Sequence, residues 1–537
     1  MPKTDKDYKT IDAVIVGAGF AGIYMLYKLR QQGLEARVIE AGSGVGGTWY
    51  WNRYPGARCD IPSMQYSYQF SEDLQQEWEW SEKYATQGEI LTYAEHVVDR
   101  FGLRDGMTFN SKVIACHYLS EEDQWQVKTD QGEQIKTRFV VMATGCLSKP
   151  NYPSIQGLRE ASVPVYHTGH WPHEGVDFTN MRVGVIGTGS SAIQSTPLIA
   201  KQAKALTVFQ RTPNYSIPAY NEPLDPDYVS QLKSRYAEYR RENWARGFGA
   251  DFDENDQSAF EVSDDQRRSA YEARWAKGGL AFLAAYNDLV FDMKANDTAR
   301  EFFQEKITAR VDDPALAEKL VPTTPIGCKR LCVDTDYYEI YNQDHVSLVD
   351  LNEEPIGCID GDAIMVGATR HEVDAIVLAT GFDAMTGAVM NIDIFGENGL
   401  SLEDKWAEGP KAYLGLATAG FPNLFLVTGP GSPSVLSNML PSIEQHVEWI
   451  SDCIEYMNRN QYRAINPETS AEDAWVEHVN EVAQTSVYPG CNSWYLGANV
   501  EGKSRVFMPY LGVPPYIEKC EEVVAAGYEG FQLMSTS

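Results

Sequence analysis

The sequence is 537 residues long and carries 75 acidic against 45 basic side chains, a net charge of −30. So acidic a surface repels phosphate backbones and anionic lipid, which disfavours nucleic acids and membranes as partners. The length predicts about two to four domains with large hydrophobic cores.

The N-terminus and the cysteines indicate the compartment. Residues 1–10 are polar without a hydrophobic signal region, and no apolar run reaches the roughly 18 residues of a membrane helix. The nine cysteines form no Cys-x-x-Cys pair and no Cys/His spacing typical of metal ligands. We therefore expect reduced thiols, no metal site and a cytoplasmic protein.

A glycine-rich turn follows the first predicted strand, residues 11–16. In Gly17-x-Gly19-x-x-Gly22, the glycines permit a tight turn, close approach of the backbone to a pyrophosphate, and packing of the next helix. A second strand, residues 36–39, ends in Glu40, whose carboxylate would accept hydrogen bonds from a ribose hydroxyl. This unit predicts a dinucleotide site, and the acid favours FAD or NAD over NADP.

A second unit of the same kind begins at residues 181–186. It continues with Gly187-x-Gly189-x-x-Ala192, and its second strand, residues 206–209, ends in Gln210-Arg211-Thr212 instead of an acid. A guanidinium binds a 2′-phosphate that a carboxylate would repel. This unit therefore predicts NADPH, and two nucleotides in one chain point to electron transfer between them, with FAD at the N-terminal unit.

The remaining pattern predicts an α/β fold with two Rossmann-type domains. Residues 140–145 and 376–381 are apolar strands that end in Ala-Thr-Gly; they either return the chain between the nucleotide domains or are plain core strands. Capping signals at Ser263-Asp264-Asp265-Gln266 and Asp313-Pro314 predict a helical insert. We expect an FAD domain at 1–148 and 385–537, an NADP domain at 152–222 and 328–380, and the insert at 223–327.

Two further stretches carry a family resemblance. Residues 46–60 read Gly-Gly-Thr-Trp-Tyr-Trp-Asn-Arg-Tyr-Pro-Gly-Ala-Arg-Cys-Asp, and residues 166–172 read Tyr-His-Thr-Gly-His-Trp-Pro. Both resemble signatures of the type I Baeyer–Villiger monooxygenases. Ala161 and Val163 stand where that family's second signature has Phe and Gly, which affects local packing at its leading edge.

The resemblance implies a reaction in two halves. NADPH reduces FAD, and the reduced flavin binds dioxygen as a C4a-peroxide. The peroxide attacks a ketone, and the tetrahedral adduct rearranges to an ester or lactone. The chemistry is the flavin's, so the protein positions it, excludes water and stabilises negative charge. The partners implied are a small ketone and dioxygen, and we expect a monomer.

The resemblance also assigns residues. Arg330 would stabilise the anionic species, with Asp60 as its orienting partner. Lys329 would bind the 2′-phosphate beside Arg211, and Trp494 would fold over NADP and substrate. His167 and Trp171 would act at the hinge between domains. The nucleotide contacts would come from Gly17, Gly19, Phe20, Gly22, Glu40, Gly47, Thr48, Trp49, Asp60, Tyr66, Gly187, Thr188, Gly189, Ser190, Gln194, Arg211, Thr212, Lys329 and Trp494. The substrate pocket would be lined by Ser434, Val435, Leu436 and Met439.

Three other functions share some of these features. A flavin monooxygenase that oxygenates nitrogen or sulfur would have the same nucleotide sites, but Asp60 with Arg330 and the Trp-Pro of the second signature favour ketones. A flavin disulfide reductase needs a redox-spaced cysteine pair after the first glycine motif, and none is present. A non-catalytic nucleotide sensor would need neither the apolar pocket nor the tryptophan over the nucleotide.

Overall fold

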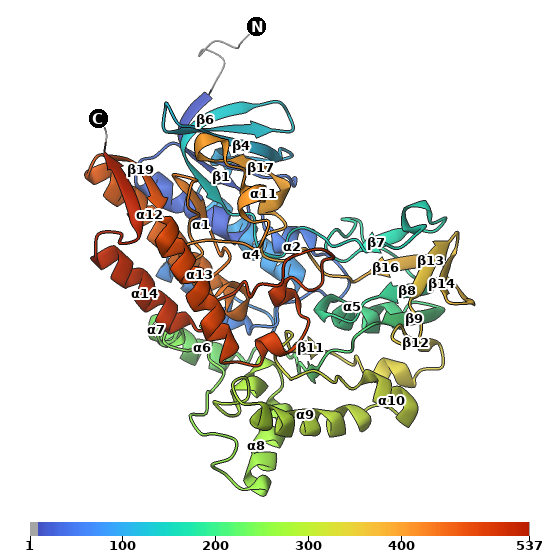
Figure 1. Cartoon of the computed structure of the whole chain (residues 1–537). Coiled ribbons are helices and arrows are strands. Elements are labelled where there is room, and N and C mark those ends of the chain that lie inside the picture. Colours follow the sequence, from blue (N-terminus) through green and yellow to red (C-terminus); the bar gives the residue numbers. More distant parts are fainter. Residues whose placement is uncertain (1–8, 536–537) are drawn as a thin grey trace.

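The computed structural model describes residues 9–535. In Figure 1 one sheet lies at the top of the molecule and a second at the right, with helices α8 to α10 below and α12 to α14 at the left. Residues 1–8, which carry most of the polar N-terminal stretch, lie outside the described residues.

The first sheet is built around the strand that precedes the first glycine motif. β1 is parallel to β6 on one side and to β2 on the other, and β4 to β6 form an antiparallel meander. The strand order is β17 (Asp393–Phe395), β4 (Val113–Leu119), β5 (Gln124–Thr129), β6 (Gln134–Met142), β1 (Lys9–Val16), β2 (Ala36–Ile39) and β3 (Met107–Thr108), with β18 (Leu424–Leu426) also paired to β6. The predicted strands 11–16 and 36–39 are confirmed.

Helices from both ends of the chain cover this sheet. The apolar helix that follows the glycine motif packs against a long helix near the C-terminus. These helices are α1 (Phe20–Gln31), α2 (Thr48–Trp51), α3 (Glu72–Glu77), α4 (Gln87–Arg100), α11 (Leu402–Lys405), α12 (Met439–Arg459), α13 (Thr469–Gln484) and α14 (Val513–Ala525). Two strands near the C-terminus, β19 (Tyr462–Pro467) and β20 (Phe531–Ser535), pair antiparallel with each other.

The second sheet is entirely parallel, as a nucleotide-binding unit built from crossover connections must be. Its order is β12 (Val346–Asp350), β9 (Ala205–Gln210), β8 (Arg182–Ile186), β16 (Ala375–Leu378) and β7 (Val165–His167). Helix α5 (Ser190–Ala200) follows β8, and a small antiparallel sheet of β13 (Ile356–Asp360), β14 (Ala363–Val366) and β15 (Thr369–Glu372) lies at the edge. The predicted strands 181–186 and 206–209 are confirmed.

The expected insert is helical. Ser263 caps α8 with the reciprocal bonds of a capping box to Gln266, and Asp313 caps α10 with Pro314 at its first position, both as predicted. Its helices are α6 (Pro226–Ser234), α7 (Tyr236–Trp244), α8 (Asp264–Lys277), α9 (Met293–Thr308) and α10 (Pro314–Leu320). A two-stranded parallel pair, β10 (Ser216–Pro218) and β11 (Cys332–Asp334), closes the insert at its base.

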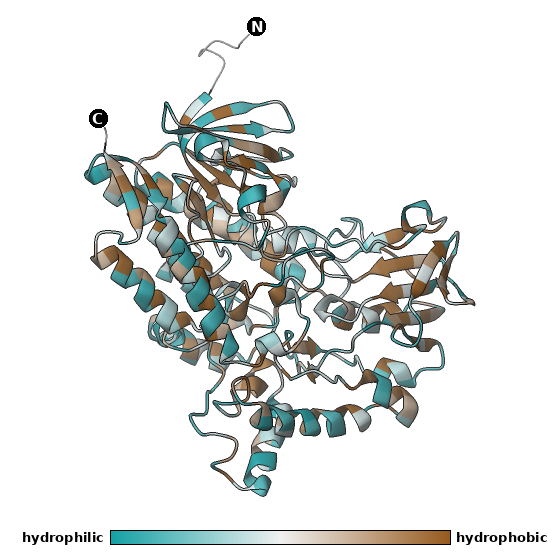
Figure 2. Cartoon of the chain, viewed as in Figure 1, coloured by the Kyte–Doolittle hydropathy of each residue, from teal (hydrophilic) through white to brown (hydrophobic). Residues whose placement is uncertain are grey.

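The strands are apolar and the insert helices are mostly polar on their surface, as Figure 2 shows. Each large sheet has its own buried core, and the core of the first extends into the insert through Tyr271, Trp275 and Phe302. Within the described residues, no helix has both the length and the apolar character needed to cross a membrane.

The expectation of reduced thiols throughout is wrong for one pair. Cys328 and Cys491 form a disulfide across 163 residues of sequence, with their Cα atoms 6.2 Å apart. The other seven cysteines are free. Spacing along the sequence could not reveal this pair, because the fold alone brings the two segments together.

Candidate functional site

The first glycine motif forms the turn that a dinucleotide requires. Gly17 has φ +105°, and a Cβ on Gly22 would lie 1.9 Å from the Gly17 carbonyl oxygen, so no larger residue fits where helix and turn meet. Helix α1 starts at Gly19 with no side-chain cap on its backbone N–H groups. An uncapped helix N-terminus behind a glycine turn fits a pyrophosphate.

Glu40 lies at the end of β2, against that turn. It is buried, and its two carboxylate oxygens accept hydrogen bonds from the backbone N–H groups of Ala18 (2.7 Å) and Gly42 (2.6 Å). Burial raises the pKa of Glu40, and these two backbone bonds oppose the rise. The carboxylate is therefore fixed beside the turn, where a ribose would lie.

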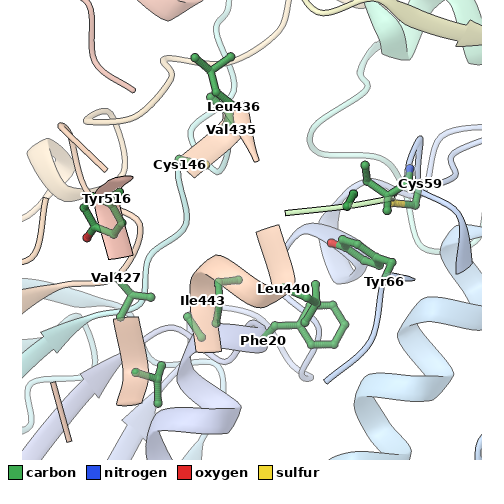
Figure 3. Close-up of a cluster of buried hydrophobic side chains, with 14 of the residues drawn as sticks. Phe20, Cys59, Tyr66, Cys146, Val427, Val435, Leu436, Leu440, Ile443 and Tyr516 are labelled. Carbon is green, nitrogen blue, oxygen red and sulfur yellow. Dashed lines mark hydrogen bonds between the residues drawn. The ribbon is translucent and has the colours of Figure 1, made fainter. Parts of the chain in front are cut away.

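A second loop closes over the first motif. A Cβ on Gly47 would approach the Cα of Gly19 to 2.8 Å, and Gly47 has φ +54°, so the two backbones meet where position 47 tolerates no side chain. Thr48 is exposed at the start of α2, and the Trp49 Nε1–H donates to the Tyr66 hydroxyl (3.2 Å). Figure 3 shows Tyr66 and Phe20 in one buried cluster that also includes Cys59, Cys146, Val435 and Leu436.

The second motif repeats the turn with a difference in the surrounding space. Gly187 has φ +114° and lies against Ala379, whereas a Cβ on Gly189 would meet nothing within 4 Å. Helix α5 again has no side-chain cap. The Thr188 hydroxyl donates to the carbonyl of Thr212 (2.6 Å), and Ser190 lies 3.3 Å from the Cys332 sulfur. This unit also fits a dinucleotide.

Two cations lie together beside the second motif. Arg211 is exposed and Lys329 half-buried, and within the part of the chain that the structure describes neither has a carboxylate partner within 4 Å. Burial, and then the charge of Arg211, lowers the pKa of Lys329. Two cations this close, without a counter-charge from the protein, suit an anion such as a 2′-phosphate.

Arg330 is held in place by three hydrogen bonds. Its Nε and Nη2 donate to the two carboxylate oxygens of Asp60 at 2.9 Å each, and its Nη1 donates to the Val435 carbonyl at 2.9 Å. The two side chains keep 19% and 23% of their surface exposed. Burial works against the charge, but Asp60 outweighs it and the pKa of Arg330 is raised. The guanidinium therefore stays charged.

The insert supplies a further contact to Arg330. The Phe248 ring lies 5.3 Å from the guanidinium carbon, in a cation–π arrangement. The Phe248 carbonyl accepts from the Asn438 backbone N–H (2.8 Å), so the same residue contacts the predicted substrate loop. Phe248 was not predicted, because nothing in its local sequence distinguishes it from other aromatic residues of the insert.

The predicted substrate loop lies next to Arg330. Ser434, Val435 and Leu436 are buried, Met439 is half-buried, and Ser434 has a left-handed backbone (φ +44°). The loop turns there, which directs the Val435 carbonyl toward Arg330. Apolar side chains and one fixed cation thus meet at a single place.

Gln194 joins the two nucleotide units directly. Its amide oxygen accepts from the Tyr54 hydroxyl (2.8 Å) and its amide nitrogen donates to the Arg58 carbonyl (3.1 Å). Its side chain is thus engaged with the loop that carries Asp60, a role that the sequence did not suggest.

His167 lies at the junction between the two sheets. It is buried at the end of β7; its Nδ1 accepts from the Gly169 backbone (2.9 Å), and its Nε2 lies 3.3 Å from the Thr380 hydroxyl, which also donates to the Asn151 carbonyl. Burial lowers the pKa of His167 to about 4, so the ring is neutral. Trp171 is buried in the core of the second sheet near Tyr166 and Phe178.

Trp494 belongs to a C-terminal segment that bridges the site. It is half-buried, begins a 3₁₀ turn and contacts the Tyr495 ring, whose phenol interacts with the charge of Arg330. Beyond it, Asn499 donates to the Phe382 carbonyl (2.6 Å) and accepts from Asn151 (2.9 Å). Residues 491–510, which we call the bridging segment, thus reach from Arg330 to the interdomain linkers.

Comparison with known proteins agrees with this geometry. The family described as pyridine nucleotide-disulphide oxidoreductase matches residues 14–272. A Baeyer-Villiger monooxygenase of Pseudooceanicola batsensis is 39% identical over 96% of this chain and 95% of its own. The phenazine N-monooxygenase PhzNO1 of Lysobacter antibioticus is 38% identical over 99% of this chain and 98% of its own.

Solved structures give the same result. A steroid monooxygenase bound to NADP superimposes with a TM-score of 0.94 and 50% identity, covering 98% of this chain and 100% of its own. The OTEMO complex with FAD and NADP has a TM-score of 0.94 and 37% identity over the same shares. Two dinucleotide-binding units around one cation define a two-nucleotide oxidoreductase. At this similarity over nearly the whole length, the chain belongs to the Baeyer–Villiger monooxygenases, as the motifs had indicated.

Proposed function

We propose that this protein is an NADPH- and dioxygen-dependent FAD monooxygenase that inserts one oxygen atom beside a ketone carbonyl and releases an ester or lactone. The observation that carries the proposal is the Arg330–Asp60 pair, which lies between the two glycine motifs and next to the apolar loop 434–436. When bound, NADPH supplies the hydride and FAD the activation of dioxygen.

Arg330 is the group best suited to the charge that develops during this reaction. It stays protonated, so it stabilises an anion without donating its proton. Asp60 fixes the plane of the guanidinium by two parallel bonds, and the Val435 carbonyl fixes its remaining edge. Because three hydrogen bonds hold it, little reorganisation is needed when negative charge appears.

Other residues would hold the nucleotides and the ketone. Glu40 would bind the FAD ribose; Arg211 and Lys329 would bind the NADP 2′-phosphate; Val435, Leu436 and Met439 would contact an apolar ketone.

His167 remains neutral above pH 4 and would position the linkers at Thr380 and Asn151. Trp494 would cover the nicotinamide side when the bridging segment closes. Trp171 would pack at the same hinge, from its buried place in the core of the second sheet.

Several broader features are also proposals. We place the FAD domain at 1–148 and 385–537, supported by the pairing of β17 and β18 with the first sheet, and the NADP domain at 152–222 and 328–380, with the insert at 223–327. We further propose a monomer in the cytoplasm that binds no nucleic acid, supported by the net charge of −30 and the seven free thiols.

The decisive experiment uses the FAD-loaded protein with NADPH, isotope-labelled dioxygen and a panel that includes cyclohexanone, phenylacetone and a steroid ketone. Mass spectrometry should find an ester or lactone that carries one labelled oxygen. NADPH consumption that yields hydrogen peroxide alone across the panel would contradict the proposal.

Nitrogen or sulfur oxygenation is the alternative, because one relative is a phenazine N-monooxygenase. The same assay with an aromatic N-heterocycle and a thioether separates the two functions. Labelled N-oxide or sulfoxide without any ester would favour the alternative.

A further inference from the structure

The disulfide joins two segments that each carry part of the site. Cys328 directly precedes Lys329 and Arg330, and Cys491 lies three residues before Trp494. Both half-cystines are buried. A single covalent bond therefore connects the Arg330 loop to the start of the bridging segment.

Apolar packing around this bond is slight. Its cluster holds Cys328, Cys491 and Val487, with Val290 of the insert packed beside them, and it is separate from the large cores. One backbone bond, from the Val487 N–H to the Val290 carbonyl (2.8 Å), joins the same parts. The disulfide is therefore the covalent restraint between the Arg330 loop and the start of the bridging segment, and the burial of Tyr495 in the core of the first sheet adds to it.

The middle of the bridging segment is held by polar contacts, whereas its far end, at Phe507, Met508 and Tyr510, is buried in the core of the first sheet. The Lys503 ammonium bonds Asp383 and the Ala384 carbonyl (2.7 Å each), and Asn499 bonds the linkers at Phe382 and Asn151. These contacts can break and re-form as the segment opens and closes, whereas its start at Cys491 cannot leave Arg330 while the disulfide is intact.

We propose that the Cys328–Cys491 disulfide is a redox-controlled tether that holds the bridging segment in its closed position over the nucleotide site. In the oxidised protein the start of the segment stays near Arg330, and its middle, residues 496–506, moves between two fixed ends. In the reduced protein it moves away more readily. The nucleotide it covers is NADP, so this part rests on the proposed function; the tether itself does not.

The redox step is an exchange between thiols and a disulfide. The two thiols of Cys328 and Cys491 transfer two electrons to a low-molecular-weight disulfide, such as glutathione disulfide; the new S–S bond forms, the reagent's S–S bond breaks, and the two protons leave on the two released thiols. A dithiol reductant reverses the step. In a reducing compartment, disulfides are commonly transient or redox-sensing, which fits the proposed location.

The first measurement is the redox state itself. The full-length protein is equilibrated in buffers of reduced and oxidised dithiothreitol and then denatured for thiol titration. We expect seven thiols in the oxidised protein, since nine cysteines include one disulfide, and nine in the reduced protein, with a reversible change between them. Nine thiols under oxidising conditions, or a bond that no native-state treatment reduces, would overturn the proposal.

The second measurement follows the bridging segment without using turnover. Trypsin should cut after Lys503 and Arg505 about fivefold faster in the reduced protein than in the oxidised protein. NADP⁺ should bind the reduced protein about fivefold more weakly. Fivefold is the lower end of the range in which two coupled sites change each other's affinity. The double variant Cys328→Ser/Cys491→Ser should match the reduced protein in every buffer. Cys358→Ser, which removes a free thiol on β13, should respond as the wild type does.

The outcomes separate the two proposals. If cleavage changes with the redox state but no ketone is oxygenated in either state, the tether stands and the proposed function fails. If both states and the double variant share one cleavage rate and one affinity for NADP⁺, the tether is refuted, whatever the enzyme oxidises.

Discussion

In the proposed reaction, Arg330 serves catalysis through the three hydrogen bonds that fix its plane. A lysine at this position would keep the charge but could not make the two parallel bonds to Asp60 together with the bond to the Val435 carbonyl. Fixed donors aimed at a developing anion are commonly the largest single electrostatic contribution to such rates. The geometry of the guanidinium, more than its charge, should therefore limit the rate.

Arg330→Lys should lower kcat for ketone oxygenation by about 10²–10³-fold, and Asp60→Asn should lower it in the same direction. Product formation and NADPH consumption should both be measured, because we expect the variants still to consume NADPH without oxygenating the ketone. Arg182→Lys, which disturbs a comparable Arg–Asp pair on β8 far from the site, is the control. An equal loss in that variant would show that the effect is one of stability.

His446 makes stability depend on pH. It is fully buried in α12; its Nδ1 accepts from Thr428 (2.9 Å), its Nε2 lies 2.8 Å from the Tyr516 hydroxyl, and burial lowers its pKa to about 3. The unfolded chain binds a proton at the ordinary pKa of about 6.5. The stabilisation is therefore complete above pH 6.5 and is lost as the pH falls toward 3, by up to about 1.4 kcal/mol per pH unit.

His446→Asn should remove this dependence, since an amide does not titrate. Urea unfolding should find the variant less stable at pH 7.5 by about 1–3 kcal/mol, with the difference shrinking steadily as the pH falls from 6.5 to 4.5. A difference that stays constant over that range would contradict this account of His446.

At the scale of the element, we propose that the residue at the end of one strand selects the coenzyme. β2 ends in Glu40 and β9 ends in Gln210, next to Arg211. The same strand–turn–helix unit thus presents an acid in one sheet and a cation in the other. Lys329, brought in by the segment before β11, adds a second cation beside Arg211.

Arg211→Gln should raise KM for NADPH by about 10-fold or more, the value of a lost charge-assisted bond, and leave KM for NADH nearly unchanged. Steady-state kinetics with both coenzymes measure the ratio of KM for NADPH to KM for NADH. Lys204→Gln, in the loop immediately before β9, should change neither value. A parallel rise in both KM values would argue against 2′-phosphate recognition by Arg211.

Elements like these were predictable because their signals are local. A β-branched run, a glycine turn and a capping box each lie within a few residues, and the strands and caps predicted from them are confirmed. The contacts of Phe248 with Arg330, of Gln194 with Tyr54, and of Cys328 with Cys491 join residues 82, 140 and 163 positions apart. No short-range pattern encodes such contacts, because they depend on how whole elements pack.

At the scale of the molecule, the bridging segment connects parts that the sequence separates widely. Asn499 is its central attachment, with bonds to both interdomain linkers. Asn499→Ala removes the bond from its side-chain amide to the Phe382 carbonyl. It leaves the bond that the Asn151 side-chain amide donates to the backbone carbonyl of residue 499. We expect KM for NADPH to rise several-fold, about the 0.5–1.5 kcal/mol of one hydrogen bond, and hydrogen peroxide to increase as a share of NADPH consumed.

Peroxide and product should be measured together for this variant. Asn460→Ala, which removes an exposed bond at the end of α12, is the control. A variant with unchanged coupling would show that the linkers do not hold the segment during turnover.

The pairing of β18 with β6 also sets an order of assembly. β6 is complete at residue 142, but the neighbour that covers its last three residues ends at residue 426. At ribosomal rates the chain needs on the order of tens of seconds to span that interval. During synthesis the apolar end of β6 therefore waits exposed while the entire second sheet emerges. Such an edge is open to non-native pairing, so nascent chains should depend on chaperones most in that window.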